Sequence, residues 1–193
     1  MLGANFEREI REQPDVWRGI ANSDKAERLA RAISDRDVVL IGSGSSLFVS
    51  QVGALALRRR GIRAHALAAT EAPLDNVAYR HAVIIACSQS GRSTDLLDAL
   101  DVLQPNQLIA LTNTPDSPLG NRANVCIDVG SGPEVAVPAS KSVSATAAIL
   151  LWAASLTSGS RSRNANTLIE TAEDVRSWLD SHEVDAVKEA AQR

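Results

Sequence analysis

Short continuous runs of apolar residues alternate along this chain with longer segments of helical spacing. Five runs rich in Val, Ile, Leu and Ala are typical of buried strands, and they cover residues 38–41, 64–68, 82–87, 108–112 and 125–129. Amphipathic or apolar segments between them predict helices over residues 47–60, 93–103 and 140–158. The terminal segments 3–34 and 167–192 also have helical spacing, and we expect breaks near Pro14, before a restart after Ser23, and near Ser181.

Strands that alternate with helices predict a parallel sheet with helices on both faces. We therefore expect an α/β fold, a three-layer αβα sandwich around a five-stranded parallel sheet of order 2-1-3-4-5, which is flavodoxin-like. A chain of 193 residues is long enough for one well-buried domain. We expect its αβα core at 35–158, an N-terminal helical arm at 1–34 and C-terminal helices at 164–193.

Two hydroxyl-rich loops follow the first and third predicted strands. The first is Gly42-Ser43-Gly44-Ser45-Ser46, and the second is Ser88-Gln89-Ser90-Gly91-Arg92-Ser93. Each loop opens a helix, so backbone N–H groups, serine hydroxyls and the positive end of a helix dipole meet there, which suits a phosphate. In the order 2-1-3-4-5 these two strands are neighbours at the switch point, where ligands bind outside the carboxyl ends. The sequence therefore predicts one phosphate site shared by both loops.

Several other classes of site are excluded by what the motifs lack. A dinucleotide-binding fingerprint needs a third glycine at the position that Leu47 occupies. A Walker loop needs a Gly-Lys-Ser/Thr motif, which this sequence lacks. A nucleophile elbow at Ser90 needs a glycine two residues earlier, and none stands there. No histidine–cysteine cluster has metal-ligand spacing, so we expect no metal and no cofactor. The net charge of −3 provides no basic surface for nucleic acid.

The sequence also bears on cellular location. Cys87 and Cys126 lie in apolar runs, and we expect both to be buried free thiols in a reducing compartment. Glu7, Arg8 and Glu9 stand where a signal peptide needs apolar residues, and no apolar run is long enough to span a membrane. We therefore expect a cytoplasmic protein without membrane contact.

The motifs, in this order, resemble those of the sugar isomerase (SIS) domain. The resemblance rests on the two serine loops, on Gly132-Pro133-Glu134 and on Lys141, and segment 9–14 looks like the family's opening arm. Within the family, the sequence most resembles the first half of the isomerase portion of glutamine–fructose-6-phosphate aminotransferase and the amino-sugar-phosphate deaminases. It implies a hexose or amino-sugar 6-phosphate as ligand, such as fructose-6-phosphate or glucosamine-6-phosphate. The implied reaction is aldose–ketose isomerisation, or isomerisation with deamination.

The resemblance also implies roles for individual residues. The residues that would hold the phosphate are those of the second loop, Ser88, Gln89, Ser90 and Ser93. Ser45 and Ser46 of the first loop would contact the sugar or its phosphate. Val137 would offer its backbone to the ligand, and Glu134 would face the sugar hydroxyls. Lys141 is a further candidate ligand contact, unless it pairs with an acid. Serines at strand–helix junctions are also common N-caps. Glu134 is the acidic residue best placed to act as a base, unless it is solvated.

The catalytic groups expected from the family are incomplete. Isomerisation needs a base beside C1 and C2, and in two-half members the glutamate, histidine and lysine that act on the sugar lie in or after a second SIS half. Three hypotheses follow. The chain is a single-domain isomerase whose homodimer or larger oligomer completes the site; or it is half of a split enzyme that needs a second SIS-domain chain; or it is a non-catalytic sugar-phosphate sensor.

Overall fold

The computed structural model describes residues 3–33, 36–72, 79, 81–157 and 163–181. The strands are β1 (Val38–Gly42), β2 (Ala64–Ala68), β3 (Val83–Ser88), β4 (Gln107–Thr112) and β5 (Val125–Asp128). The helices are α1 (Ala4–Ala21), α2 (Lys25–Ala32), α3 (Ser45–Arg58), α5 (Thr94–Leu103), α6 (Pro118–Arg122), α7 (Lys141–Leu156) and α8 (Arg163–Leu179).

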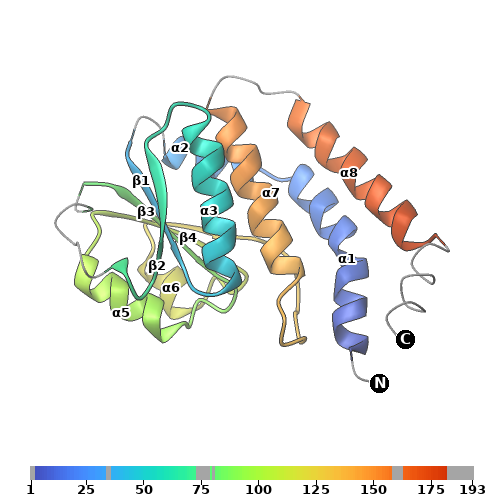
Figure 1. Ribbon diagram of the computed structural model, residues 1–193, viewed down its shortest axis with the longest axis horizontal. Helices are drawn as coiled ribbons and strands as arrows, with labels where there is room; N and C mark the ends of the chain where they lie inside the picture. The colour runs from blue at the N-terminus through green and yellow to red at the C-terminus, as the bar shows by residue number, and fades with distance from the viewer. Residues whose placement is uncertain (1–2, 34–35, 73–78, 80, 158–162, 182–193) are drawn as a thin grey trace.

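The strands form one parallel sheet in the order β2-β1-β3-β4-β5 (Figure 1). The predicted fold class and strand order are therefore confirmed. In the central register, Val38 of β1 lies between Ala64 of β2 and Val83 of β3. This register brings the carboxyl ends of β1 and β3, and the serine loops that follow them, to the same edge of the sheet.

Alternate residues of the central strands pack into separate cores on the two faces of the sheet. Leu40 of β1 and Ile85 of β3 belong to a core with α2, α3 and α7, whereas Ile41 and Ile84 belong to a core with α5 and α6. All four side chains are fully buried. Burial on both faces is the reason that β1 and β3 read as continuous apolar runs.

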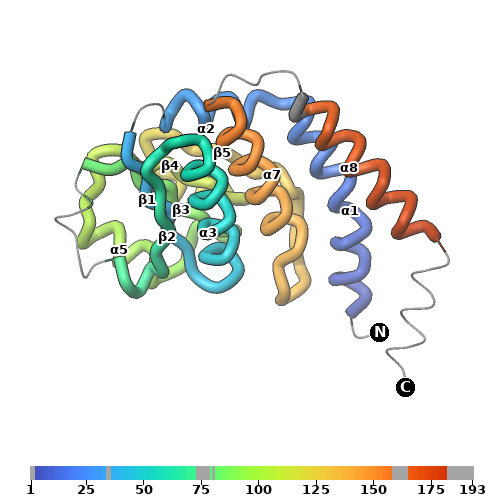
Figure 2. Tube along the Cα trace, turned by 45° about the horizontal axis from the view of Figure 1, so that its top comes forward, coloured from blue at the N-terminus to red at the C-terminus, as the bar shows by residue number. Residues whose placement is uncertain are grey.

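Helices α1 and α8 form an outer pair on the far side of α7 from the sheet (Figures 1 and 2). Helix α1 contacts both α7 and α8. The side of the apolar helix α7 that faces away from the sheet is therefore partly covered by the chain itself.

The expected break near Pro14 is wrong. Helix α1 continues from Ala4 to Ala21 with Pro14 buried inside it. A proline within a helix removes one hydrogen bond and costs about 3 kcal/mol, so the packing of α1 against α7 and α8 offsets a real penalty. The expected restart after Ser23 is confirmed, because α2 begins at Lys25.

Two other segments differ from expectation. Helix α6 is absent from the sequence-based prediction, although its signals are present: the Ser117 side chain accepts a hydrogen bond from the Gly120 amide, and Pro118 is the first helical residue. Helix α8 begins at Arg163, earlier than predicted, and ends at Leu179. The helix expected after Ser181 lies outside the described residues.

Candidate functional site

The first serine loop turns tightly from β1 into α3. A Cβ atom on Gly42 would lie 2.7 Å from the carbonyl carbon of Ser46, so the loop approaches the strand too closely for any side chain. Gly44 has φ 57° and ψ −130°, which glycine adopts without steric cost. These two glycines place Ser45 and Ser46 in the first turn of α3, where Ser45 is exposed and Ser46 half-buried.

The second serine loop turns from β3 into α5. Gly91 has φ +61°, and a Cβ atom there would lie 1.9 Å from the Ser117 hydroxyl. The Ser88 hydroxyl accepts a hydrogen bond from the Gly91 amide at 3.1 Å, and the Ser90 hydroxyl accepts one from the Arg92 amide at 3.2 Å. Because each hydroxyl acts here as an acceptor, its proton can be donated to another group.

Helix capping does not account for the serines. Ser93 is the N-cap residue of α5, but its side chain makes no capping hydrogen bond. The N-cap residue of α3 is Gly44, again without a side-chain cap. The first-turn amides of α3 and α5 are therefore not covered by a capping side chain, which suits an anionic ligand.

The two serine loops meet around one small cavity. Its lining comes from the second serine loop, from the residue Ala139 before α7 and from the first two turns of α3 and α7. It comprises Ser45, Ser46, Val49, Gln89, Ala139, Ser142, Val143 and Thr146. The cavity volume of about 20 Å³ is enough for about one water molecule. The cavity is therefore too small to enclose a ligand of the size that the sequence predicts.

Glu134 is bound to the N-terminus of α7. Its Oε1 accepts hydrogen bonds from the amides of Ser140 at 2.8 Å, Lys141 at 2.7 Å and Ser142 at 3.3 Å, and its Oε2 accepts one from the Ser142 hydroxyl. A carboxylate at this position satisfies unpaired amides and interacts favourably with the helix dipole. Glu134 is therefore not simply solvated, and its action as a base stays a prediction.

Lys141 and Val137 are not among the residues that line the small cavity. Lys141 is 2% exposed. Its ammonium group donates to Glu12 and, at 2.7 Å, to the carbonyl oxygen of Pro133. Lys141 thus pairs with an acid, Glu12, which was the alternative to a ligand contact. The Val137 side chain is 99% exposed and is not part of the cavity lining.

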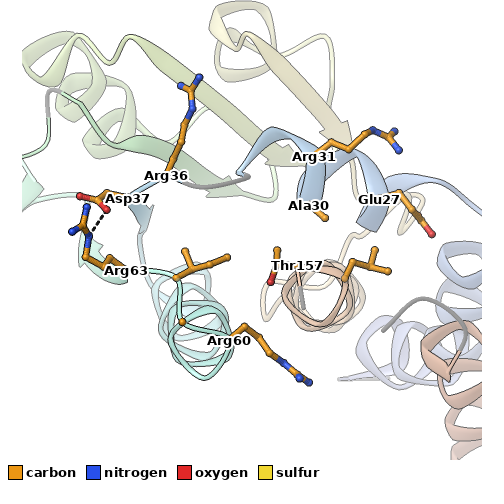
Figure 3. Close-up of a pocket in the computed structure, with 11 residues that line it drawn as sticks. Glu27, Ala30, Arg31, Arg36, Asp37, Arg60, Arg63 and Thr157 are labelled. Carbon is orange, nitrogen blue, oxygen red and sulfur yellow. Dashed lines mark hydrogen bonds and ion pairs between the residues drawn. The ribbon is translucent and has the colours of Figure 1, made fainter. Parts of the chain in front are cut away.

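A larger cavity, of about 840 Å³, lies at the opposite end of the sheet, where β1 and β2 begin and α3 and α7 end. Its lining includes Arg31, Arg36, Arg60 and Arg63. Figure 3 shows the first three of these arginines pointing away from one another, while Arg63 is bonded to Asp37 at 2.5 Å. Since the guanidinium groups do not converge, this cavity is not built to hold an anion.

Sequence reasoning missed the contributions of α1 and α7. Ser142 and Thr146 line the small cavity, and their spacing of four residues places them on the same face of a largely apolar helix, which is the signal that marks them. Glu9 of α1 is fully buried and accepts hydrogen bonds from the amides of Val135 and Ala136. No local pattern in the sequence identifies that contact.

The described residues contain no group of three or more His, Cys, Asp or Glu that could hold a metal ion. None of the helices in the described part of the chain combines the length and apolar character that a membrane span requires. Both cysteines are free, as expected; Cys87 is buried, but Cys126 is only partly so. Burial raises the pKa of the Cys87 thiol to about 11, against a smaller opposing effect of its hydrogen bond with Ser50.

A doubly wound parallel sheet with hydroxyl-rich loops at the carboxyl ends of two neighbouring central strands defines a class of α/β protein suited to phosphorylated ligands. Comparison with known proteins then identifies the family. The family model of the SIS domain matches residues 33–156. The chain belongs to the SIS domain family.

Known relatives agree with this assignment. Glutamine–fructose-6-phosphate aminotransferase (isomerizing) from Sulfolobus acidocaldarius is 31% identical over 142 residues, which are 69% of this chain and 24% of that protein. The chain thus spans about a quarter or less of the length of the curated relatives it matches.

Two solved structures show the same fold. Glucosamine-6-phosphate deaminase from Thermotoga maritima matches with a TM-score of 0.73 and 23% identity, over 88% of this chain and 54% of that one. Tagatose-6-phosphate ketose/aldose isomerase from Escherichia coli matches with a TM-score of 0.75 and 18% identity, over 93% of this chain and 54% of that one.

Proposed function

We propose that this chain binds the phosphate of a hexose or amino-sugar 6-phosphate and takes part in aldose–ketose isomerisation, or isomerisation with deamination, of that sugar. One observation carries the proposal: the two serine loops, far apart in the sequence, lie side by side at one edge of the sheet, where Ser45, Ser46 and Gln89 are close enough to line one small cavity. The SIS family and the aminotransferase relative support this class of ligand.

The chemistry of the two loops suits a phosphate. Ser88 and Ser90 keep hydroxyl protons to donate, and the uncapped N-terminus of α5 adds amides and a favourable dipole. Arg92 is exposed on the same loop and supplies a positive charge. Because a hydrogen bond to a charged group contributes about 1.5–3 kcal/mol, several such bonds would favour a phosphorylated sugar over the free sugar.

Proton transfer between C1 and C2 needs a base. We propose Glu134 for this role, because its loop leads directly into Ala139 and Ser142 of the cavity lining. Its oxygens are, however, already engaged by the first turn of α7. That engagement favours a second candidate function, in which the chain is one half of an enzyme and another SIS-domain chain brings the base. In a third, the chain senses the sugar phosphate without turning it over.

We also propose that the protein forms a homodimer or a larger oligomer, in the cytoplasm. Phe48, Val52 and Leu55 lie on one face of α3 and are 65%, 46% and 44% exposed, and Leu151 of the adjacent α7 is 47% exposed. Large apolar side chains gathered on one surface are typical of protein contacts. Since Phe48 is one turn from Ser45, a second copy bound to this stripe would lie at the edge of the serine loops.

Titration calorimetry of the purified chain tests the proposed ligand. Fructose-6-phosphate and glucosamine-6-phosphate are compared with fructose, glucosamine and inorganic phosphate. We expect each free sugar to bind at least about tenfold more weakly than its phosphate ester. Equal affinity for the free and phosphorylated sugars, or binding of neither ester, would contradict the proposal. Turnover of a bound ester by the pure chain then separates the isomerase from the half-enzyme and the sensor.

A further inference from the structure

The loop that carries Glu134 is held in place by the N-terminal helix. Glu9 of α1 is fully buried. Its Oε1 accepts hydrogen bonds from the amides of Val135 at 2.6 Å and Ala136 at 3.1 Å, and its Oε2 accepts one from Ala136 at 3.3 Å. Both oxygens of this carboxylate therefore bind the backbone of a loop that lies 126 residues later in the chain.

A second carboxylate on the same helix binds the lysine that joins the two ends of that loop. Glu12, one turn beyond Glu9, pairs with the buried ammonium group of Lys141, which also donates to the carbonyl oxygen of Pro133 at 2.7 Å. Near the start of the loop, Glu134 bonds to the first turn of α7. Helix α1 thus bonds directly to Val135 and Ala136 through Glu9 and to Lys141 through Glu12. Pro133 is tied to this contact through the Lys141 ammonium group, and Glu134 ties the loop to α7.

Docking of α1 by itself does not explain a carboxylate at position 9. Burial of a charge is costly, and an apolar side chain of similar volume often stabilises a helix contact as well or better. Helix α1 has other contacts with α7, such as the bond from the Trp17 indole to the Ser144 hydroxyl at 3.2 Å. Within the described residues, the hydrogen bonds of the Glu9 side chain go to the loop.

We propose that Glu9 is a positioning residue for the ligand site. By fixing the backbone of Val135 and Ala136, it sets where Glu134 and Ala139 stand relative to the serine loops. This inference rests on the proposed function for the identity of the ligand. Helix α1 then supports the ligand site through Glu9. Displacement of α1 lowers the affinity for a sugar phosphate without any change in the serine loops.

Amide hydrogen exchange tests the positioning without a ligand. Glu9→Gln keeps the shape of the side chain but removes the charge and one acceptor oxygen. The matched control is Glu7→Gln, which removes an exposed carboxylate on the same helix, 3.5 Å from Arg11. In Glu9→Gln we expect the amides of Val135 and Ala136 to exchange at least about tenfold faster, with wild-type rates throughout α7 and in the control. Unchanged exchange at these two amides overturns the proposal, and so does an equal rise throughout α1 and α7.

Affinity for fructose-6-phosphate is the second readout. In Glu9→Gln we expect it to fall at least about fivefold, while the amides of the 88–93 loop keep their exchange rates and Glu7→Gln binds as the wild type does. Faster exchange at Val135 and Ala136 with wild-type affinity overturns the role in ligand binding. A wild-type protein that binds no sugar phosphate contradicts the proposed function and this role together, whereas the exchange rates still decide whether Glu9 holds the loop.

Discussion

The Oε1 atom of Glu134 accepts a hydrogen bond from the backbone amide of Lys141 at 2.7 Å, at the first residue of α7. The amides of Ser140 and Ser142 share the same oxygen. The residue proposed as the base is thus also the cap of the helix that lines the cavity. A substitution at position 134 therefore acts on the stability of the protein as well as on its chemistry.

Substitutions of Glu134 first measure its contribution to the stability of the protein. A charge at a helix N-terminus contributes about 0.3–1 kcal/mol, and up to about 2 kcal/mol when partly buried. We expect Glu134→Gln to lower the free energy of unfolding by about 1 kcal/mol and Glu134→Ala to lower it further, because three amides lose their acceptor. Urea denaturation measures both, and wild-type stability in Glu134→Ala would contradict the capping role.

In a chain that is active alone, Glu134→Gln is also expected to abolish solvent-proton exchange at C2 of the sugar while fructose-6-phosphate still binds, because the amide cannot act as a base. Proton NMR in heavy water follows this exchange. Exchange at the wild-type rate in the variant would rule out Glu134 as the base.

The close approach at Gly42 gives a stability prediction for the first serine loop. A methyl group at Gly42 would meet the Ser46 backbone at 2.7 Å, and backbone cannot move aside cheaply. We expect Gly42→Ala to lower the free energy of unfolding by about 1–3 kcal/mol. Gly19→Ala is the control: nothing lies within 4 Å of a Cβ atom there, and alanine in a helix should raise stability by about 0.5–1 kcal/mol. Equal effects of the two substitutions in urea denaturation would show that the Ser46 backbone does not lie so close to Gly42.

Acid titration of stability reports on Glu9. Burial by itself raises the pKa of Glu9, but hydrogen bonds from Val135 and Ala136 and the charges of Lys141 and Arg8 together outweigh burial and lower the pKa below its ordinary value of 4.5. A carboxyl group with a lowered pKa in the folded state stabilises the protein above its unfolded pKa, and this stabilisation is lost as the pH falls through its folded pKa.

We therefore expect the difference in unfolding free energy between wild type and Glu9→Gln to be constant near neutral pH and to shrink below about pH 4.5. Urea denaturation of both proteins at a series of pH values measures it. A difference that widens on acidification would mean that Glu9 is protonated in the folded protein.

The apolar stripe on α3 predicts the oligomeric state. Light scattering at a concentration on the order of tens of micromolar should give the mass of a dimer or larger species. We expect Phe48→Glu to produce monomers, because it places a charge on the most exposed apolar residue of the α3 stripe. Val102→Glu is the control, on a residue of α5 that is 47% exposed and lies across the sheet. A wild-type monomer, or loss of the dimer in both variants, would contradict the proposed surface.

The sheet was predictable from sequence, because β1 and β3 are buried on both faces and so form unbroken apolar runs. The path of α1 was not predictable in the same way. Pro14 predicts a break by its local chemistry, whereas the packing of α1 on α7 and α8 is a tertiary effect that overrides this preference.

The serine loops were predictable as neighbours, because strand order alone brings the ends of β1 and β3 together. The partners of Glu134 and Lys141 were not. They depend on how segment 133–141 folds back on α1, through contacts such as the one from Val135 to Glu9 across 126 residues. Periodicity and local motifs do not record contacts of that range.

Titration calorimetry with fructose-6-phosphate shows whether loop 88–93 binds the phosphate of a sugar phosphate. Three proteins are compared: wild type, Ser90→Ala, and the control Thr171→Ala, which removes an exposed hydroxyl on α8. We predict that Ser90→Ala weakens binding by about tenfold or more with the fold intact, while Thr171→Ala binds as the wild type does. Equal affinity of Ser90→Ala and wild type would mean that loop 88–93 does not hold the phosphate through Ser90.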